Sequence, residues 1–485
     1  MAEEIELKLE LTPEAADCLE ASPLLQGAAT KVDQRAIYFD TPDRTLFANG
    51  LSLRIRRSGR KRVQTVKADD PKAAGLFARP EWEMPVKSDT PVLDDRTPVR
   101  ALLGEDCETV APAFAVHVQR RTWMIADGDA EIELVVDRGA VILGERQAPI
   151  CEVELELKAG APTALFALAR RIDAIAPVRI GVLTKSERGY RLLGPAPALF
   201  KAEQVVLEPG QPAHQAFRRI ARNCLRHYRL NEAILLERPV PEALHQARVA
   251  LRRLRSAFGI FKPMLADART AHFRDELRWL SSTLGDARNL DVLVGKAVPG
   301  PLHDRLEAAR DAAYADVETA LASARARSLM IDLVEWLADG DWLRALNAAD
   351  ARYMPAAPFA AAALRRLRRK VRTGGRYIAA IDEEERHEVR KDAKKLRYAS
   401  EFFATLFAEK RQRRRFKAFV GALGELQDIL GALNDRATAP AVLAQLGLAD
   451  EKGARALLDG RKTSKLLAAA PDAQAELVDA KRFWV

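Results

Sequence analysis

Cysteine is scarce in this chain of 485 residues. Its four cysteines are scattered and none forms a CxxC pair, so the sequence predicts neither a disulfide framework nor a zinc site and fits a reducing compartment. Aromatic residues make up 6% of the chain and are almost missing from its basic segments. Binding of single-stranded nucleic acid relies on aromatic stacking, so that class of partner is poorly supported.

Long apolar runs and an N-terminal targeting segment are also missing. No run approaches the ~20 residues needed to cross a bilayer. The first residues, Met-Ala-Glu-Glu, are acidic and lead directly into a predicted strand, which is unlike a signal peptide. We therefore expect a soluble, cytoplasmic protein without a membrane partner.

Positive charge is present in excess but is unevenly distributed. Residues 1–200 hold 27 Lys and Arg against 31 Asp and Glu, whereas residues 201–485 hold 50 against 37. The second part therefore carries a net charge of +13 and suits a polyanionic partner. Because 485 residues exceed what one core usually supports, two or three domains are expected.

The first region reads as a series of strands. Residues 4–10 alternate acidic or basic side chains with apolar ones, and residues 152–158 repeat the design. Further strands are predicted at 35–40, 51–57, 62–68, 79–86, 117–126, 130–138, 150–157 and 178–186, with helices at 12–25, 98–104 and 163–175. A long antiparallel sheet with few helices is expected to close on itself, because closure removes exposed edges.

Charged residues occupy one face of nearly every one of these strands. Taken singly, such faces are usually the solvated side of a sheet. Taken together, they favour an inside-out arrangement in which the charged faces line a tunnel and the apolar faces pack outward against helices.

Residues 1–190 resemble a CYTH domain, the fold of the triphosphate tunnel metalloenzymes, which is an eight-stranded antiparallel tunnel. An ExExK strand by itself is a weak signal, but here an ordered set of motifs follows it. The set consists of Glu4, Glu6 and Lys8, then Ile37–Pro42, Leu53–Arg56, Val66-Lys67, Arg79–Glu81, Ile132–Asp137, Cys151–Glu156, Leu183–Ser186 and Arg188–Tyr190.

The resemblance implies a metal-dependent triphosphatase. Cations would bind the triphosphate, and carboxylates would hold Mg²⁺ or Mn²⁺. The expected substrate-binding residues are Lys8, Arg54, Arg56, Lys67, Arg120, Lys185 and Arg188. The family implies Glu4, Glu6, Glu133, Glu152 and Glu154 as metal ligands, and the expected catalytic set is Glu4, Glu6, Lys8 and Glu154.

The second region, which follows a Pro-rich and Gly-rich linker, is helical almost throughout and contains an internal repeat. Residues 245–255 match residues 387–397 at an offset of 142, and flanking segments recur at similar offsets in the same order. Two helical bundles are expected, at about 205–345 and 350–485. Each repeated helix carries a histidine followed by a basic stripe. Singly, such a run is usually a solvated face.

Residues 205–485 resemble a CHAD domain, whose hallmark is this pair of histidine helices. The resemblance implies binding of long-chain inorganic polyphosphate by His245, Arg248, Arg252, Arg253, Arg255, His387, Arg390, Lys391, Lys394 and Arg397. Metal binding by the two histidines is the alternative, but the surrounding cations disfavour it. We assign no role to the segment after about residue 440.

The sequence therefore predicts an α+β protein: a CYTH tunnel at 1–200 and an all-α CHAD domain of two repeated bundles at 205–485. The expected function is hydrolysis of inorganic tripolyphosphate, with polyphosphate granules as a conceivable location in the cytoplasm. Two alternatives stay open: a non-enzymatic protein that binds such granules, and an enzyme acting on thiamine triphosphate or ATP, whose organic part would need groups such as Tyr38 or Trp82.

Overall fold

The computed structural model describes residues 3–68, 74–457 and 460–485; the side chains of a few of these, Glu4 and Arg79 among them, lie outside the description. The described residues form two compact units. The first comprises Met1–Ala198 together with Ala322–Asp339, and the second comprises Leu199–Leu321 together with Gly340–Val485. We describe each unit separately.

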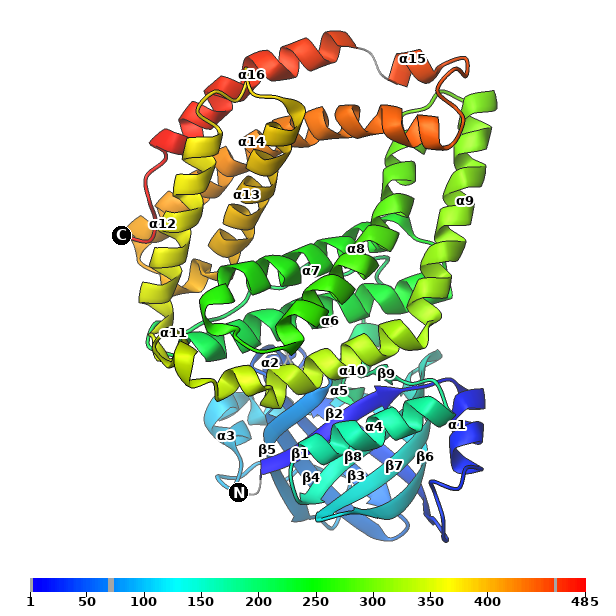
Figure 1. Ribbon diagram of the computed structural model, residues 1–485. Helices are drawn as coiled ribbons and strands as arrows, with labels where there is room; N and C mark the ends of the chain where they lie inside the picture. Colours follow the sequence, from blue (N-terminus) through cyan, green and yellow to red (C-terminus); the bar gives the residue numbers. More distant parts are fainter. Residues whose placement is uncertain (1–2, 69–73, 458–459) are drawn as a thin grey trace. The chain divides into compact units, whose positions relative to one another are not determined.

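The first unit is built on an antiparallel sheet that closes into a tunnel (Figure 1). Hydrogen bonds join its strands in the order β5-β4-β3-β2-β6-β7-β8-β1, and β1 pairs with β5 to complete the ring. The predicted eight-stranded tunnel is thus confirmed. Its strands are β1 (Glu3–Glu10), β2 (Thr30–Asp40), β3 (Leu51–Ser58), β4 (Lys61–Ala68), β5 (Leu76–Pro85), β6 (Ala111–Asp127), β7 (Ala130–Leu143) and β8 (Arg146–Ala159).

The apolar faces of the strands pack outward against helices, as the alternation predicts. One such cluster joins Leu53, Ile55 and Val66 of the sheet to Val99 and Leu103 of a covering helix. The helices of this unit are α1 (Pro13–Glu20), α2 (Thr45–Ala48), α3 (Pro98–Leu103), α4 (Thr163–Ile175), α5 (Lys185–Leu192) and α10 (Ala324–Asp339). Thr12 caps α1 by accepting a hydrogen bond from the Ala15 amide, so α1 begins where the sequence predicts but ends earlier.

The predicted strand at 178–186 is wrong. Only Arg179–Ile180 forms a short strand, β9, which pairs with β1, and α5 begins at Lys185. A capping box between Thr184 and Glu187 starts this helix. The apolar run therefore does not continue as a strand, because the Thr184-to-Glu187 hydrogen bonds satisfy the first turn of a helix instead.

Helix α5 packs against an apolar cluster inside the tunnel. Tyr190 of α5 joins Tyr38, Phe114 and Val116 from the inward faces of the strands. A side-chain carbon on Gly189 would lie 2.1 Å from the Phe114 ring, so only glycine allows this approach. The cluster fills one part of the tunnel and leaves the charged part beside the start of α5.

The second unit is all helical, which confirms the predicted class. Its repeated helices α7 and α13 have the same length, and their first residues are 142 positions apart, as the repeat predicts. The helices are α6 (Ala213–Glu237), α7 (Pro241–Ile260), α8 (Arg269–Val294), α9 (Pro301–Ala322), α11 (Ala349–Tyr353), α12 (Ala356–Gly374), α13 (Glu383–Phe402), α14 (Lys410–Gln445), α15 (Ala454–Leu457) and α16 (Gly460–Asp479).

The C-terminal segment, which has no role in the sequence analysis, anchors the end of the second unit. Helix α16 packs along α14 (Figure 1). Beyond it, Phe483 and Trp484 are buried against Phe419, and Phe483 also contacts Phe407 and Phe416. Across the described part of the chain, no helix is both long enough and apolar enough to span a bilayer.

Candidate functional site

One wall of the tunnel carries three rows of charged side chains that face each other across neighbouring strands. Every second residue of β1, β7 and β8 points inward, so strand register alone sets these rows. The rows are Glu133–Glu156–Glu6, Val135–Glu154–Lys8 and Asp137–Glu152–Glu10, and Arg120 of β6 extends the third.

Two buried lysines lie among the carboxylates of this wall. The Nζ atom of Lys8 lies 2.6 Å from Glu154 and 3.0 Å from Glu152. The Nζ atom of Lys185, at the start of α5, lies 2.8 Å from Glu154, 2.6 Å from Glu152 and 2.7 Å from Asp137. The carboxylate oxygens of Asp137, Glu152 and Glu154 lie within 4.8 Å of one another, so this cluster could hold a cation.

Mutual attraction keeps these groups ionised. Burial lowers the pKa of Lys8, but Glu152 and Glu154 outweigh this effect and raise that pKa above its usual value. The pKa of Lys185 is raised in the same way by Asp137, Glu152 and Glu154. Conversely, Lys185 and Lys8 hold the pKa of Glu154 well below its usual value in spite of its burial. At neutral pH Lys8, Lys185 and Glu154 are therefore all charged.

Arg120 connects the second and third rows. Its guanidinium donates from Nε and Nη2 to the two oxygens of Asp137, at 2.8 and 2.5 Å, and also from Nη2 to Glu154 at 2.9 Å. Asp137 is fully buried and does not line the cavity, whereas Arg120 does. The pair fixes the guanidinium plane, because a bidentate contact constrains its orientation.

A cavity of about 620 Å³ opens beside this wall. Six of the seven cations predicted to bind substrate line it, and so do three of the predicted carboxylates. Its charged lining consists of Lys8, Arg54, Arg56, Lys67, Arg120, Lys158 and Lys185 together with Glu6, Glu81, Glu83, Glu133, Glu154 and Glu156.

Three predicted site residues fall outside this lining. Glu152 is buried behind Lys8 and Lys185 and does not line the cavity. Arg188 pairs with Glu10 instead of reaching the cavity. The side chain of Glu4 lies outside the described residues, although its backbone is placed on β1 opposite Arg79.

Several residues of this site are not among those predicted from the sequence. Glu156 and Lys158 continue the alternation that singles out Glu152 and Glu154, so the pattern already places them on the inward face. Asp137 lies in a quoted motif but was assigned no role. Glu81 pairs with Lys67 at 3.0 Å and Glu83 pairs with Arg56 at 3.0 Å, so both carboxylates hold predicted cations.

Three carboxylates lie side by side in the first row. Glu133, Glu156 and Glu6 are direct neighbours across three strands, and like charges in this position repel each other. Lys158 offsets part of this repulsion, at 2.6 Å from Glu156 and 3.6 Å from Glu133. Carboxylate oxygens in this number are the ligands that Mg²⁺ and Mn²⁺ prefer.

A second, larger cavity lies in the helical unit. Its volume is about 2100 Å³, and all ten residues predicted to bind polyphosphate line it. Sixteen of the described lining residues are Lys or Arg and five are Asp or Glu. The cations that the sequence analysis missed come largely from other segments: Lys201, Arg274, Arg278, Arg288, Lys296, Lys395, Arg436 and Lys465.

Some basic residues of this cavity are not paired with carboxylates in the described part of the chain. Within the described residues, no salt bridge joins Arg248, Arg252 or Lys394 to an acidic side chain. Burial and the neighbouring Arg252 lower the pKa of Lys394 to about 6, with further repulsion from Arg390 and Arg248. Burial and nearby arginines likewise lower the pKa of His245 to about 4. Unpaired cations that repel each other are stabilised by an anion.

Other predicted residues of this cavity are already engaged. Arg253 is buried, pairs with Glu401 and lies 4.7 Å from the centre of the Phe402 ring. Arg397 binds the same carboxylate at 3.0 Å. His387 contacts the Asn434 side-chain oxygen at 2.7 Å through Nδ1. These contacts hold the cavity wall in place.

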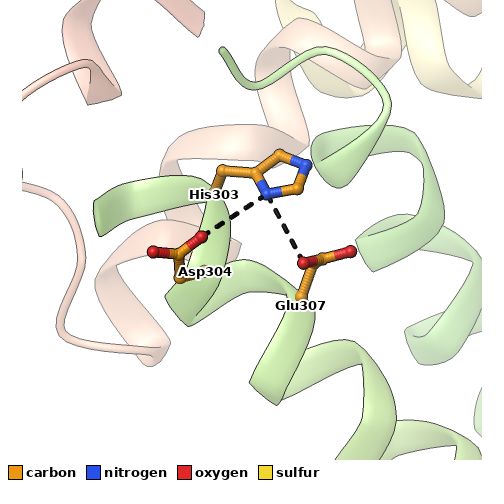
Figure 2. Close-up of side chains that lie close together, drawn as sticks. All are labelled: His303, Asp304 and Glu307. Atoms are coloured by element: carbon orange, nitrogen blue, oxygen red, sulfur yellow. Dashed lines mark ion pairs between the residues drawn. The ribbon is translucent and has the colours of Figure 1, made fainter. Parts of the chain in front are cut away.

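A further cluster of possible metal ligands, His303, Asp304 and Glu307, lies on α9 (Figure 2). Figure 2 shows all three side chains on one stretch of this helix. Nδ1 of His303 lies 3.9 Å from Asp304 and 3.6 Å from Glu307. Asp304 is exposed, whereas His303 and Glu307 are half-buried. Such groups are common on helix surfaces, and we assign this cluster no ligand.

Sequence relatives cover parts of the chain. An inorganic triphosphatase of Haemophilus influenzae is 29% identical over 198 residues, which is 40% of this chain and 55% of the relative. An uncharacterized protein of Mycobacterium tuberculosis is 28% identical over 314 residues, or 56% of each chain. The chain thus spans just over half the length of these curated relatives.

The crystal structure of the CHAD domain from Ricinus communis covers 58% of this chain and 97% of its own, with 28% identity and a TM-score of 0.49. Residues 2–190 match the CYTH domain family, and residues 219–444 match the CHAD domain family. The chain therefore joins a CYTH domain to a CHAD domain.

Proposed function

We propose that the tunnel hydrolyses inorganic triphosphate with the help of Mg²⁺ or Mn²⁺. The observation that carries this proposal is the convergence of Lys8, Arg54, Arg56, Lys67, Arg120 and Lys185 on one cavity beside a row of glutamates. The distant likeness to an inorganic triphosphatase supports it.

Charge balance supports a divalent cation. Seven cations and six carboxylates are found among the described residues of the lining, so its net charge is small. A triphosphate carries about four negative charges near neutral pH. Glu6, Glu133, Glu154 and Glu156 would hold the metal ion, with Glu4 and Glu152 as the other predicted ligands. When bound, the ion would neutralise phosphate charge and lower the pKa of a water.

The chain's own residues would bind and orient the substrate. The raised pKa values of Lys8 and Lys185 keep both ammonium groups charged, so each can donate to a phosphate oxygen. Water would attack the terminal phosphorus in line with the anhydride oxygen, and the cations would stabilise the charge on the phosphoryl oxygens. No histidine or cysteine occurs in the described lining, so neither residue type is placed there to form a covalent intermediate.

The lining favours an inorganic substrate over a nucleotide or thiamine triphosphate. Trp82 packs in an apolar cluster with Leu53 and Val66 and does not line the cavity. Tyr38 does line it, but its ring is stacked on Phe114 and its hydroxyl accepts a hydrogen bond from Arg54 at 3.3 Å. Little aromatic surface is therefore left for a base or a thiazolium ring.

For the helical unit, we propose binding of long-chain polyphosphate. The supporting observation is a cavity whose described lining includes sixteen Lys and Arg residues but only five Asp and Glu residues. A flexible polyanion could contact the basic residues of α7, α8, α13 and α14 in succession. Cations already paired, such as Arg253, would hold the wall, and those not paired with carboxylates would contact phosphate.

The decisive experiment measures phosphate release from tripolyphosphate, ATP and thiamine triphosphate, each with Mg²⁺, with Mn²⁺ and with EDTA. We expect metal-dependent release from tripolyphosphate and far slower release from the two organic compounds. Binding without turnover of any of them would favour the non-enzymatic granule-binding protein. Formation of cyclic AMP would reassign the reaction to cyclisation.

A further inference from the structure

Helix α10 interrupts the helical unit in sequence but belongs to the tunnel unit in space. The chain leaves the helical unit after α9, contributes α10 to the tunnel unit and then returns. Within the tunnel unit, α10 packs against α4 and β9 (Figure 1). Two ion-paired contacts fix it to α4. At the first, Arg170 of α4 binds Asp332 and Glu335 of α10 with four hydrogen bonds.

The second contact is buried and leads toward the active site. Arg327 of α10 donates from Nε to Oδ1 of Asp173 at 2.6 Å, and both side chains are less than a tenth exposed. The same Asp173 oxygen accepts a hydrogen bond at 2.9 Å from the amide of Val178. A carboxylate in this position needs its cation, because an uncompensated buried charge is costly.

The backbone that follows Val178 pairs with β1, which belongs to the charged wall of the tunnel. Residues Arg179 and Ile180 pair with Glu10 and Leu9 of β1. The next amide, that of Gly181, donates to the carbonyl of Lys8 at 2.8 Å. A side-chain carbon on Gly181 would lie 2.8 Å from Cγ of Lys8, so this segment is packed closely against the lysine stem. Four residues later the chain reaches Lys185.

We propose that α10 is a positioning element of the triphosphate site. Through Asp173, Arg327 holds the segment 178–185 against β1 and thereby places Lys8 and Lys185 over Glu152 and Glu154. Arg327 does not touch the cavity and acts only through these residues. This inference rests on the proposed function for its kinetic consequence, but the positioning itself can be measured without turnover.

The test uses the full-length protein and the rate at which an amine-specific acylating reagent labels individual lysines, read by mass spectrometry. Lys8 and Lys185 are 2% and 7% exposed, so both should label slowly in the parent protein. Arg327→Ala should raise labelling of Lys185 at least tenfold and increase amide hydrogen exchange at 178–182. Ser328→Ala is the control, because Ser328 is an exposed residue on the same helix, next to Arg327. It should change neither signal.

The kinetic part of the test separates positioning from general stability. Arg327→Ala should raise KM for tripolyphosphate and lower kcat, whereas Arg327→Lys should recover much of both by restoring the charge. Unchanged Lys185 labelling in a folded Arg327→Ala protein would overturn the inference, and so would an equal rise in Ser328→Ala. If Arg327→Ala does not fold, Arg327→Lys must raise the labelling of Lys185 above that of the parent protein for the inference to stand. If the parent protein hydrolyses no triphosphate, the proposed function fails and the labelling result alone decides the positioning.

Discussion

Lys8 and Lys185 share the same two carboxylate oxygens. Oε1 of Glu152 lies 3.0 Å from Lys8 and 2.6 Å from Lys185, and Oε1 of Glu154 lies 2.6 and 2.8 Å from the same two nitrogens. The two lysines come from opposite ends of the tunnel domain's sequence. Glu154 also lines the cavity, so it can both orient the lysines and contact a bound metal ion.

Replacing Glu154 by Gln should abolish triphosphate hydrolysis while the fold is kept. Loss of this charge removes a metal ligand and loosens both lysines, and a fall in kcat on the order of 10²-fold or more is expected. Glu4→Gln should act similarly if Glu4 is also a ligand. Glu131→Gln is the matched control, because Glu131 is an exposed residue on neighbouring β7. Normal turnover of Glu154→Gln at saturating Mg²⁺, in a protein with unchanged circular dichroism, would remove this residue from the site.

Replacing Arg56 or Lys8 by Ala should raise KM for tripolyphosphate as well as slow turnover. Cations of the lining bind the substrate in its ground state and in the transition state alike, so part of the loss appears in KM. Arg57→Ala provides the control, since Arg57 is exposed and its Nε donates to the Gly59 carbonyl instead. Steady-state kinetics in which KM is unchanged for both variants would place these two side chains outside the substrate site.

Polyphosphate binding by the helical unit should require no metal and should weaken steeply with salt. Contacts between cations and a linear polyanion release counterions, so log affinity should fall linearly with log salt. The double reversal of Arg252 and Lys394 to Glu should weaken binding far more than reversal of Arg411 and Arg414. The latter two are exposed arginines of α14 that do not line the cavity.

Titration of the two double variants in EDTA at fixed ionic strength makes the comparison. Equal losses would point to diffuse attraction by net charge and would contradict a defined binding cavity. If double-stranded DNA competes as well as polyphosphate does, the partner of this unit is nucleic acid.

Polyphosphate binding should also take up protons. Because the pKa of Lys394 is lowered to about 6, this lysine is mostly neutral at pH 7.5 in the free protein, and a bound anion favours its charged form. Affinity should therefore rise as pH falls from about 8 toward 6 and level off below that. Calorimetry in buffers of different ionisation enthalpy should detect proton uptake that decreases in Lys394→Met. Equal proton uptake in both proteins would contradict this assignment.

The lowered pKa of Lys394 also makes the stability of the ligand-free protein depend on pH. The unfolded chain binds a proton at Lys394 more readily than the folded chain does, because the folded-state pKa lies below the usual value of 10.5. This group alone therefore lowers the free energy of unfolding as pH falls from about 10 toward 6. Thermal melts of the parent protein and of Lys394→Met across this range should converge at high pH and separate at low pH.

Much of the architecture follows from local patterns in the sequence. Alternation of charged and apolar residues identifies most strands of the tunnel, since a strand exposes successive side chains to opposite faces. The offset of 142 residues predicts helices α7 and α13 with matching lengths. Local chemistry also misleads at 178–186, where β-branched residues favour a strand and the Thr184–Glu187 capping box, a contact over one turn, starts a helix.

The sequence alone determined which faces of the strands and helices are charged, because side-chain periodicity is a property of the local backbone. Only the tertiary structure decided which charges meet. Glu152 was predicted alongside Glu154, and Arg188 alongside Lys185, from the same sequence motifs. Glu154 and Lys185 line the cavity, whereas Glu152 and Arg188 do not. Likewise, α10 lies in the sequence of the helical region, but its salt bridges to Arg170 and Asp173 make it part of the tunnel unit. Contacts between residues more than 140 positions apart depend on how whole elements pack, and no local pattern encodes that packing.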